Sequence, residues 1–92
     1  MEHSEHMSGT ATVTVRYFAG AQAATGVEAE QLPLAAPLPL AELADELARR
    51  HGAGLARVLE AASFLIDEVP GPRDRVVPTG AVVDVLPPFA GG

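Results

Sequence analysis

The sequence contains no cysteine and no tryptophan, and aromatic residues make up only 4% of its 92 positions. Without cysteine the chain can form no disulfide, thiolate zinc site or cysteine nucleophile, so any sulfur chemistry must use sulfur brought by another molecule. With so few aromatics, the core must be built mainly from valine, leucine, isoleucine and alanine, with Tyr17, Phe18 and Phe64 as its larger members. This composition predicts a small, compact fold.

Long apolar runs and positive charge are also scarce. No run approaches the roughly 20 apolar residues of a membrane span, and the N-terminus lacks the basic-then-apolar pattern of a secretion signal, so we expect a cytoplasmic protein that binds no membrane. Twelve acidic and six basic residues give a net charge of −6. This charge opposes binding to nucleic acid and favours a basic protein partner, although solubility alone is a sufficient reason for it.

The length predicts one domain, and a domain this small has little room for the pocket of roughly 300 Å³ or more that a small molecule needs. We therefore expect no internal catalytic site. Residues 1–10 are polar and unpatterned, which predicts a disordered leader. Residues 11–86 form the predicted domain, and residues 87–92 a flexible tail.

Alternating polar and apolar residues predict the opening of the fold. Residues 11–18 alternate, with two valines and Tyr17 on one face, which is typical of a strand. Residues 19–26 are small and polar with a glycine near each end, so we expect a loop there. Residues 27–34 then form a weaker second strand, and the two strands can pair as an antiparallel hairpin.

A helix is predicted to begin near Pro39, because a proline in the first turn loses no hydrogen bond. One face of this segment is apolar, whereas Asp45–Arg49 and Glu46–Arg50 can pair on the exposed side. Gly52 supplies a stop. The apolar stripe comprises Leu40, Leu43, Ala44, Leu47 and Ala48.

The remaining pattern predicts one or two further helical turns over 55–59 and strands over 63–67, 73–77 and 81–86. The order is therefore β-β-α-β-β. This order favours an α+β, ubiquitin-like β-grasp fold, in which a mixed sheet carries one main helix on one face. The alternative is a split β-α-β, ferredoxin-like sheet, which needs a second full helix, and residues 54–62 are short for that role.

Few side chains outside the core suggest a site of their own. His3 and His6 lie in the leader and His51 at a helix end, so we expect no metal site. Asp67 and Glu68 are adjacent, and we interpret them as strand-end and turn residues, since neighbouring strand positions face opposite ways. In addition, Arg16, Arg73 and Arg75 either meet acidic groups of a partner or are solvated charges on edge strands.

The chain ends in an unusual tail directly after the last predicted strand. Pro87-Pro88 stiffens the exit and cannot continue the sheet, and Phe89-Ala90-Gly91-Gly92 follows. Two glycines without side chains can enter a channel only as wide as a backbone and present a carboxylate to a buried reaction centre. A carboxylate is a poor acyl donor, but attack on the α-phosphate of ATP makes an acyl adenylate that sulfur can then displace.

Two segments carry a resemblance to a known family. VTVRYFAGAQAATG, residues Val13 to Gly26, and VVDVLPPFAGG, residues Val82 to Gly92, resemble the opening strand and tail of the MoaD/ThiS family of sulfur carriers. The resemblance runs end to end except for the leader. An LPP-x-AGG ending after a valine-rich strand is similar to the molybdopterin synthase small subunit in particular.

This resemblance implies a role in molybdenum cofactor biosynthesis. A MoeB-like, E1-like enzyme would use ATP to adenylate Gly92, a sulfurtransferase would supply sulfur, and the thiocarboxylate would enter a MoaE-like large subunit in a heterotetramer. The small subunit is then not an enzyme itself, and it contributes no catalytic side chain and binds no cofactor or metal. The implied roles are modification for Gly92, threading for Gly91 and Ala90, and partner docking for Phe89, Pro88 and Pro87.

Several alternatives remain open at this stage. Phe89 could instead fold back onto its own sheet. The segment Asp67 to Pro72 stands where the family often has an Asn-Gly type turn, which leaves the partner specificity open. Other carriers with a Gly-Gly end serve cysteine, thiazole or secondary-metabolite pathways, so the final pathway is open as well. A ubiquitin-like modifier joined to lysines through Gly92, and a structural module with an irrelevant tail, are the other two function classes.

Overall fold

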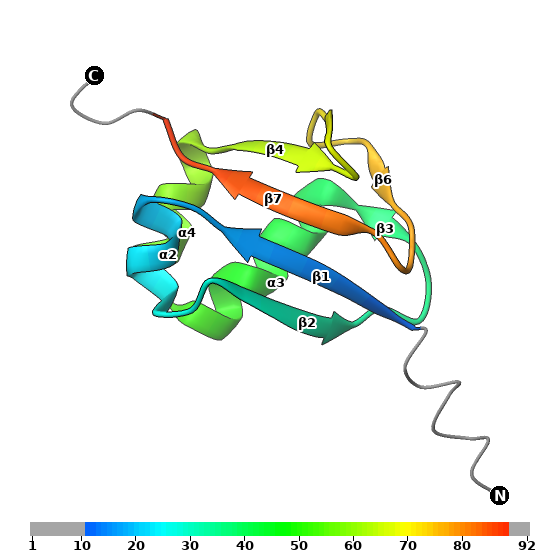
Figure 1. Ribbon diagram of the computed structural model, residues 1–92, viewed down its shortest axis with the longest axis horizontal. Helices are drawn as coiled ribbons and strands as arrows, with labels where there is room; N and C mark the ends of the chain where they lie inside the picture. Colours follow the sequence, from blue (N-terminus) through cyan, green and yellow to red (C-terminus); the bar gives the residue numbers. More distant parts are fainter. Residues whose placement is uncertain (1–10, 89–92) are drawn as a thin grey trace, which may run out of the picture.

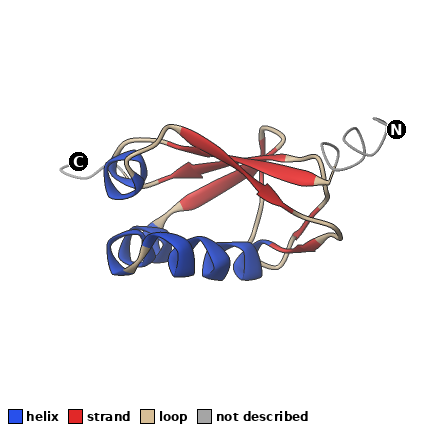
Figure 2. Ribbon diagram, turned by 90° about the horizontal axis from the view of Figure 1, so that it is seen from below, coloured by secondary structure: helices blue, strands red, loops and turns tan. Residues whose placement is uncertain are grey.

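A five-stranded mixed sheet forms one layer of the protein, and helices pack against one of its faces (Figures 1 and 2). The computed structural model describes residues 11–88. The strand order is β2-β1-β7-β4-β5. These strands are β1 (Thr12–Tyr17), β2 (Ala29–Pro33), β4 (Ser63–Ile66), β5 (Val69–Pro70) and β7 (Val82–Leu86).

The first and last main strands lie side by side at the centre of the sheet. β1 pairs with β2 in antiparallel register and with β7 in parallel register, so the segment between β1 and β7 must cross over the sheet. The buried side chains of β1 are Val13, Val15 and Tyr17, as the alternation predicts. The mixed sheet with its main helix on one face confirms the predicted β-grasp arrangement.

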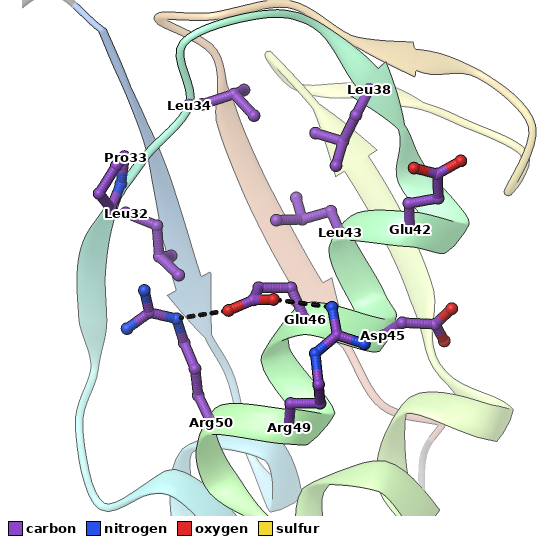
Figure 3. A pocket seen from close by; sticks show the side chains of 10 residues that line it. All are labelled: Leu32, Pro33, Leu34, Leu38, Glu42, Leu43, Asp45, Glu46, Arg49 and Arg50. Carbon is purple, nitrogen blue, oxygen red and sulfur yellow. Dashed lines mark hydrogen bonds and ion pairs between the residues drawn. The ribbon is translucent and has the colours of Figure 1, made fainter.

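The main helix, α3 (Leu40–His51), begins immediately after Pro39, as predicted. Its apolar stripe faces the sheet, and Leu40 and Leu47 are fully buried in the core. One predicted ion pair is wrong: Arg49 contacts Glu46 at 2.7 Å instead of Asp45, and Arg50 contacts the other oxygen of Glu46 at 3.3 Å (Figure 3). No helix within residues 11–88 is long and apolar enough to span a membrane.

Gly52 separates α3 from a second helix, α4 (Ala53–Ala61), which occupies the segment predicted to contain further turns. The backbone of Gly52 has φ 94° and ψ −171°, a region that is essentially restricted to glycine. Its N–H still donates to the carbonyl of Ala48. A single residue therefore ends one helix and begins the next, and the resulting angle lets both helices pack on the sheet.

Replacing Gly52 with alanine is expected to lower the free energy of unfolding by about 1–3 kcal/mol, because a Cβ atom is disfavoured at this φ and ψ. Urea denaturation followed by circular dichroism measures the change. Gly54→Ala is the matched control, since Gly54 lies within α4 and an added Cβ there meets no atom within 4 Å. Equal stability of the two variants would contradict the strain at Gly52.

Two predicted elements differ from the structure. Residues 19–26, expected as a loop, contain the helix α2 (Gly20–Thr25), whose Ala21 is fully buried and whose end is capped by the Gly26 N–H. The alanine-rich segment has high helix propensity, but only its packing against α4 makes so short a helix stable. The strand predicted over 73–77 is reduced to β6 (Val76–Val77), which pairs with β3 (Leu38–Pro39) outside the main sheet.

The turn between β4 and β5 contains Asp67 and Glu68, which confirms their interpretation as turn residues. Both have positive φ, 49° and 71°, as a tight hairpin turn of the type favoured by Asn-Gly requires. Asp67 also accepts a hydrogen bond from the Val82 N–H at 2.9 Å through its side chain. The turn thus has the positive φ angles of an Asn-Gly turn, and the Asp67 side chain bonds it to β7.

Candidate functional site

The last strand is a rigid stem for the C-terminal end of the chain. β7 lies between β1 and β4 and pairs with both, and it ends at Leu86. Pro87 and Pro88 follow and leave the sheet at one end of the molecule (Figure 1). Phe89, Ala90, Gly91 and Gly92, the remaining predicted site residues, lie outside the described residues.

An ion pair joins this stem to the neighbouring strand. Arg16 on β1 donates two hydrogen bonds to the carboxylate of Asp84 on β7, at 2.6 and 2.8 Å. Asp84 is only 5% exposed, and this bidentate geometry is the strong form of the interaction. The guanidinium of Arg16 also lies 5.9 Å from the ring centre of Phe18. Arg16 therefore holds the stem from a central strand and not from an edge strand, with 43% of its side chain exposed.

A second predicted arginine also serves the fold. Arg73 donates to the carbonyl oxygens of Leu59 and Ala62 at 2.6 and 3.3 Å, and its guanidinium lies 5.0 Å from the ring centre of Phe64. It thereby adds a donor for carbonyl groups at the end of α4, where the Leu59 carbonyl also accepts from the Ala62 N–H. Arg73 and Arg75 are both exposed.

An open groove of about 810 Å³ lies at the base of the tail, between α2, α4 and the adjoining ends of β4 and β7. This space exceeds what we expected of so small a domain, because it lies on the surface between elements and not inside the core. Its lining is apolar apart from Ser63 and one charged side chain, Arg57. It is lined by Phe18, Ala19, Gly20, Gly54, Arg57, Val58, Ala61, Ser63, Leu86, Pro87 and Pro88.

Pro87 and Pro88, predicted as docking contacts, thus form part of a larger surface that the sequence did not reveal. Val58 and Ala61 lie three residues apart on α4 and therefore on the same side of the helix. In the sequence they are indistinguishable from core positions. The groove therefore begins where the described part of the tail ends, at Pro88.

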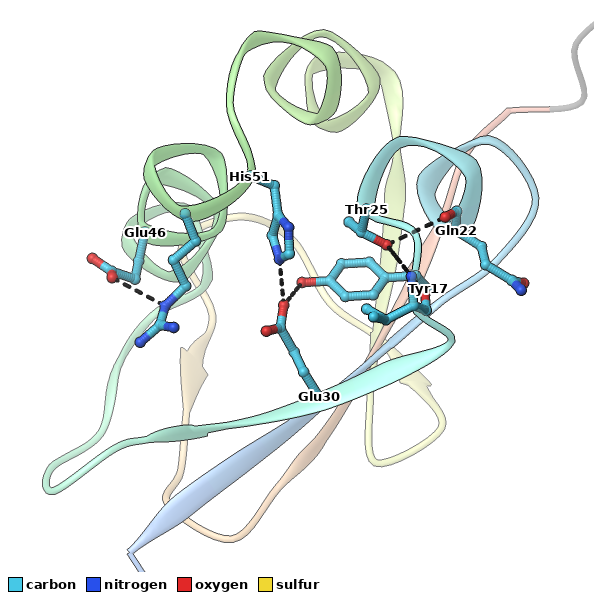
Figure 4. A network of polar contacts seen from close by, with 8 residues as sticks. Tyr17, Gln22, Thr25, Glu30, Glu46 and His51 are labelled. Carbon is cyan, nitrogen blue, oxygen red and sulfur yellow. Dashed lines mark hydrogen bonds and ion pairs between the residues drawn. The ribbon is translucent and has the colours of Figure 1, made fainter.

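A partly buried polar network joins β1, β2 and the end of α3 (Figure 4). The Tyr17 hydroxyl donates to one carboxylate oxygen of Glu30, and His51 Nε2 lies 2.6 Å from the same oxygen. The rings of Tyr17 and His51 meet edge to face at 5.7 Å. Desolvation and the bond to Glu30 raise the pKa of Tyr17 well above its usual value, so the hydroxyl remains a donor.

Burial by itself would raise the pKa of Glu30, but the hydrogen bonds from Tyr17 and His51 outweigh it and lower the pKa below 4.5. A carboxylate with a lowered folded pKa stabilises the protein above its unfolded pKa, and this contribution is lost as the pH falls through the folded value. The network was not predicted, because its members are far apart in the sequence.

Tyr17→Phe is expected to lower the free energy of unfolding at pH 7 by about 1 kcal/mol, since the carboxylate loses a donor. The difference between the two proteins should shrink in acid, below the pH at which Glu30 ionises. Urea denaturation at neutral pH and near pH 3 measures both values. As a control, the effect of Tyr17→Phe in a chain that already carries Glu30→Gln should be the same at both pH values. A Tyr17→Phe effect that is equal at both pH values would contradict a charged acceptor.

Within residues 11–88, no three histidine or acidic side chains come together as a metal site would require. His51 is engaged by Glu30, whereas His3 and His6 lie outside the described residues. The stem β7 and the groove at the base of the tail are therefore the candidate functional site.

The sequence from residue 15 to residue 92 matches the model of the ThiS family. Small archaeal modifier protein 1 from Haloferax volcanii has a TM-score of 0.75 at 16% identity, over 86% of this chain and 99% of that one. A putative molybdopterin converting factor subunit 1 from Pyrococcus furiosus has a TM-score of 0.70 at 24% identity, over 85% and 98%. The complex of subunits 1 and 2 of molybdopterin-converting factor from Helicobacter pylori includes a similar chain, with a TM-score of 0.60 at 22% identity over 88% and 99%.

No curated protein matches the sequence. The structural similarities show the fold, and the family match extends over most of the chain to its last residue. This chain therefore belongs to the ThiS family and has the ubiquitin-like fold of MoaD/ThiS sulfur carriers.

Proposed function

We propose that this chain is a sulfur carrier whose Gly92 is adenylated and then converted to a thiocarboxylate that donates sulfur in molybdopterin biosynthesis. The observation that supports this proposal most is the stem at the tail. β7 is held on both sides and by Arg16, and it leads through Pro87 and Pro88 directly to a Gly-Gly end. A carrier of this kind needs a rigid body and a slender reactive end.

The chemistry belongs to partner enzymes. In the proposed reaction, a Gly92 carboxylate oxygen attacks the α-phosphate of ATP on a MoeB-like, E1-like enzyme, and pyrophosphate leaves. Hydrosulfide supplied by a sulfurtransferase then attacks the acyl carbon, AMP leaves, and loss of the S–H proton gives the thiocarboxylate. Because the chain has no cysteine, it cannot provide that sulfur itself. The reaction uses ATP and is proposed to occur in the cytoplasm.

The groove at the base of the tail is proposed to bind these partners. Its surface is apolar and includes Pro87 and Pro88, so an enzyme that encloses the tail can bury both together. The related fold in the Helicobacter pylori structure is part of a complex of subunits 1 and 2. By analogy, we propose a MoaE-like large subunit as the acceptor of the thiocarboxylate, in a heterotetramer.

A second candidate function is attachment to other proteins. The Haloferax volcanii relative in fold is named a small archaeal modifier protein, and a Gly92 adenylate could be captured by a lysine amine as well as by sulfur. The two functions differ in their product, which is a thiocarboxylate for a carrier and an isopeptide conjugate for a modifier.

Intact mass spectrometry distinguishes them. The full chain is incubated with lysate of its host, ATP and sulfide, beside a control that lacks Gly92. The expected result is a mass gain that matches exchange of one terminal oxygen for sulfur, present only with the intact end. Conjugates without this gain would favour the modifier. An unchanged mass, in a lysate that activates a known carrier, would refute the proposal.

A further inference from the structure

The free edge of the sheet offers a row of backbone groups far from the tail. The Leu34 N–H donates to Ala11, and the Glu28 carbonyl accepts from Tyr17, so the even-numbered residues of β2 point their backbone groups toward β1. Because these groups alternate along an antiparallel strand, those of Ala29, Gln31 and Pro33 point away from the sheet. Within residues 11–88, the edge thus presents two N–H groups and three carbonyls that bond to no other strand.

A groove of about 490 Å³ runs between this strand and α3 (Figure 3). Leu32 and Leu34 on the strand side face Leu43 on the helix, with Leu38 at one end. Side chains of an added strand that face the helix would enter this groove, because strand side chains alternate between the two faces. The side chain of Gln31 instead bonds to Thr14 on the other face.

Some of the charged residues that line the groove form ion pairs with one another, and others do not. Glu46 is paired with both Arg49 and Arg50, so these three side chains together are net positive at that end of the groove. Glu42 and Asp45 also line the groove, and neither forms an ion pair within the part of the chain that the structure describes. The side of the groove with Glu42 and Asp45 therefore favours a positively charged group of an occupant.

We propose that the β2 edge and this groove form a docking site for an extended peptide segment of a partner, with apolar and basic side chains facing α3. Such a segment would add a strand to the sheet through Ala29 and Gln31 and place its basic group near Glu42. A second copy of this chain fits less well, because in a symmetric antiparallel pairing Pro33 lacks the N–H that the opposite strand requires.

The site is separate from the proposed function. The groove at the tail is lined by α2, α4 and the end of β7, whereas this one is lined by β2, β3 and α3. The proposed partner can therefore bind while the tail is being modified. If no peptide binds at the β2 edge, the sulfur-carrier proposal is unaffected. If the tail is unreactive, the proposed docking site is unaffected.

Nuclear magnetic resonance with the full ¹⁵N-labelled chain tests the proposal. The probe is a synthetic peptide with threonine at outward positions and valine followed by lysine at groove-facing positions. We expect saturable shifts in Glu42 and its neighbours, and slower hydrogen exchange of the Ala29 and Gln31 amides. Shifts confined to the tail groove, no saturable shifts, or concentration-dependent protection without peptide, which indicates a second copy, would each overturn the proposal.

Two variants make the test specific. Gln31→Pro removes one outward N–H without breaking a bond to β1, and it should weaken binding about ten-fold relative to Gln31→Ala. Glu42→Lys, on the exposed side of α3, should lose the lysine peptide and gain a matched glutamate peptide, which tests the site even if Gln31→Pro does not fold. Unchanged preference in Glu42→Lys, or equal affinity of folded Gln31→Pro and Gln31→Ala, would refute the site.

Discussion

Adding one alanine after Gly92 is expected to reduce thiocarboxylate formation by at least about 100-fold. The added residue moves the reactive carboxylate by one residue length, and a displacement of about 1 Å at a reaction centre can already cost that much. The body of the protein should be unaffected, because no contact within residues 11–88 depends on the new residue. The measurement is the thiocarboxylate fraction by intact mass spectrometry against time.

The matched control is the same alanine added at the N-terminus, which should leave the reaction rate unchanged. Thermal denaturation of all three proteins shows whether the fold is intact. A C-terminally extended chain that is modified at the normal rate would mean that Gly92 is not the reacting residue. The activating enzyme would then accept a carboxylate one residue further along the chain.

Replacing Ala61 with lysine is expected to slow adenylation about 10- to 100-fold, as for loss of a central contact in an interface. Ala61 is exposed on α4 and lines the groove at the base of the tail. A long charged side chain there would occupy the apolar surface and place a second positive charge one turn from Arg57. The rate of ATP-dependent pyrophosphate release with the activating enzyme measures the effect.

Ala41→Lys is the control, because Ala41 is also an exposed helical alanine but does not line that groove. It should react as the unmodified chain does. Both variants should also unfold at similar urea concentrations. If Ala61→Lys is adenylated normally, the enzyme does not contact the groove, and the tail alone is recognised.

Local patterns predicted most of the elements correctly. The alternation over residues 11–18, the leucine stripe after Pro39 and the stop at Gly52 depend on near neighbours in the chain, and all three are found in the structure. The segment over residues 19–26 was predicted wrongly, because its helix is stabilised by packing on α4 and not by its own sequence. The pairing of β3 with β6 was likewise invisible, since two-residue strands carry no periodicity.

The sequence by itself determined the chemical possibilities of this protein. The absence of cysteine excludes its own sulfur nucleophile, and the Gly-Gly ending with its family resemblance indicates where a modification would occur. Only the tertiary structure decided how the tail is supported and recognised. Arg16 pairs with Asp84, and Phe18 and Ala61 line one groove, because the parallel pairing of β1 with β7 and the angle at Gly52 bring distant segments together. Such contacts depend on long-range geometry, which no local pattern of residues encodes.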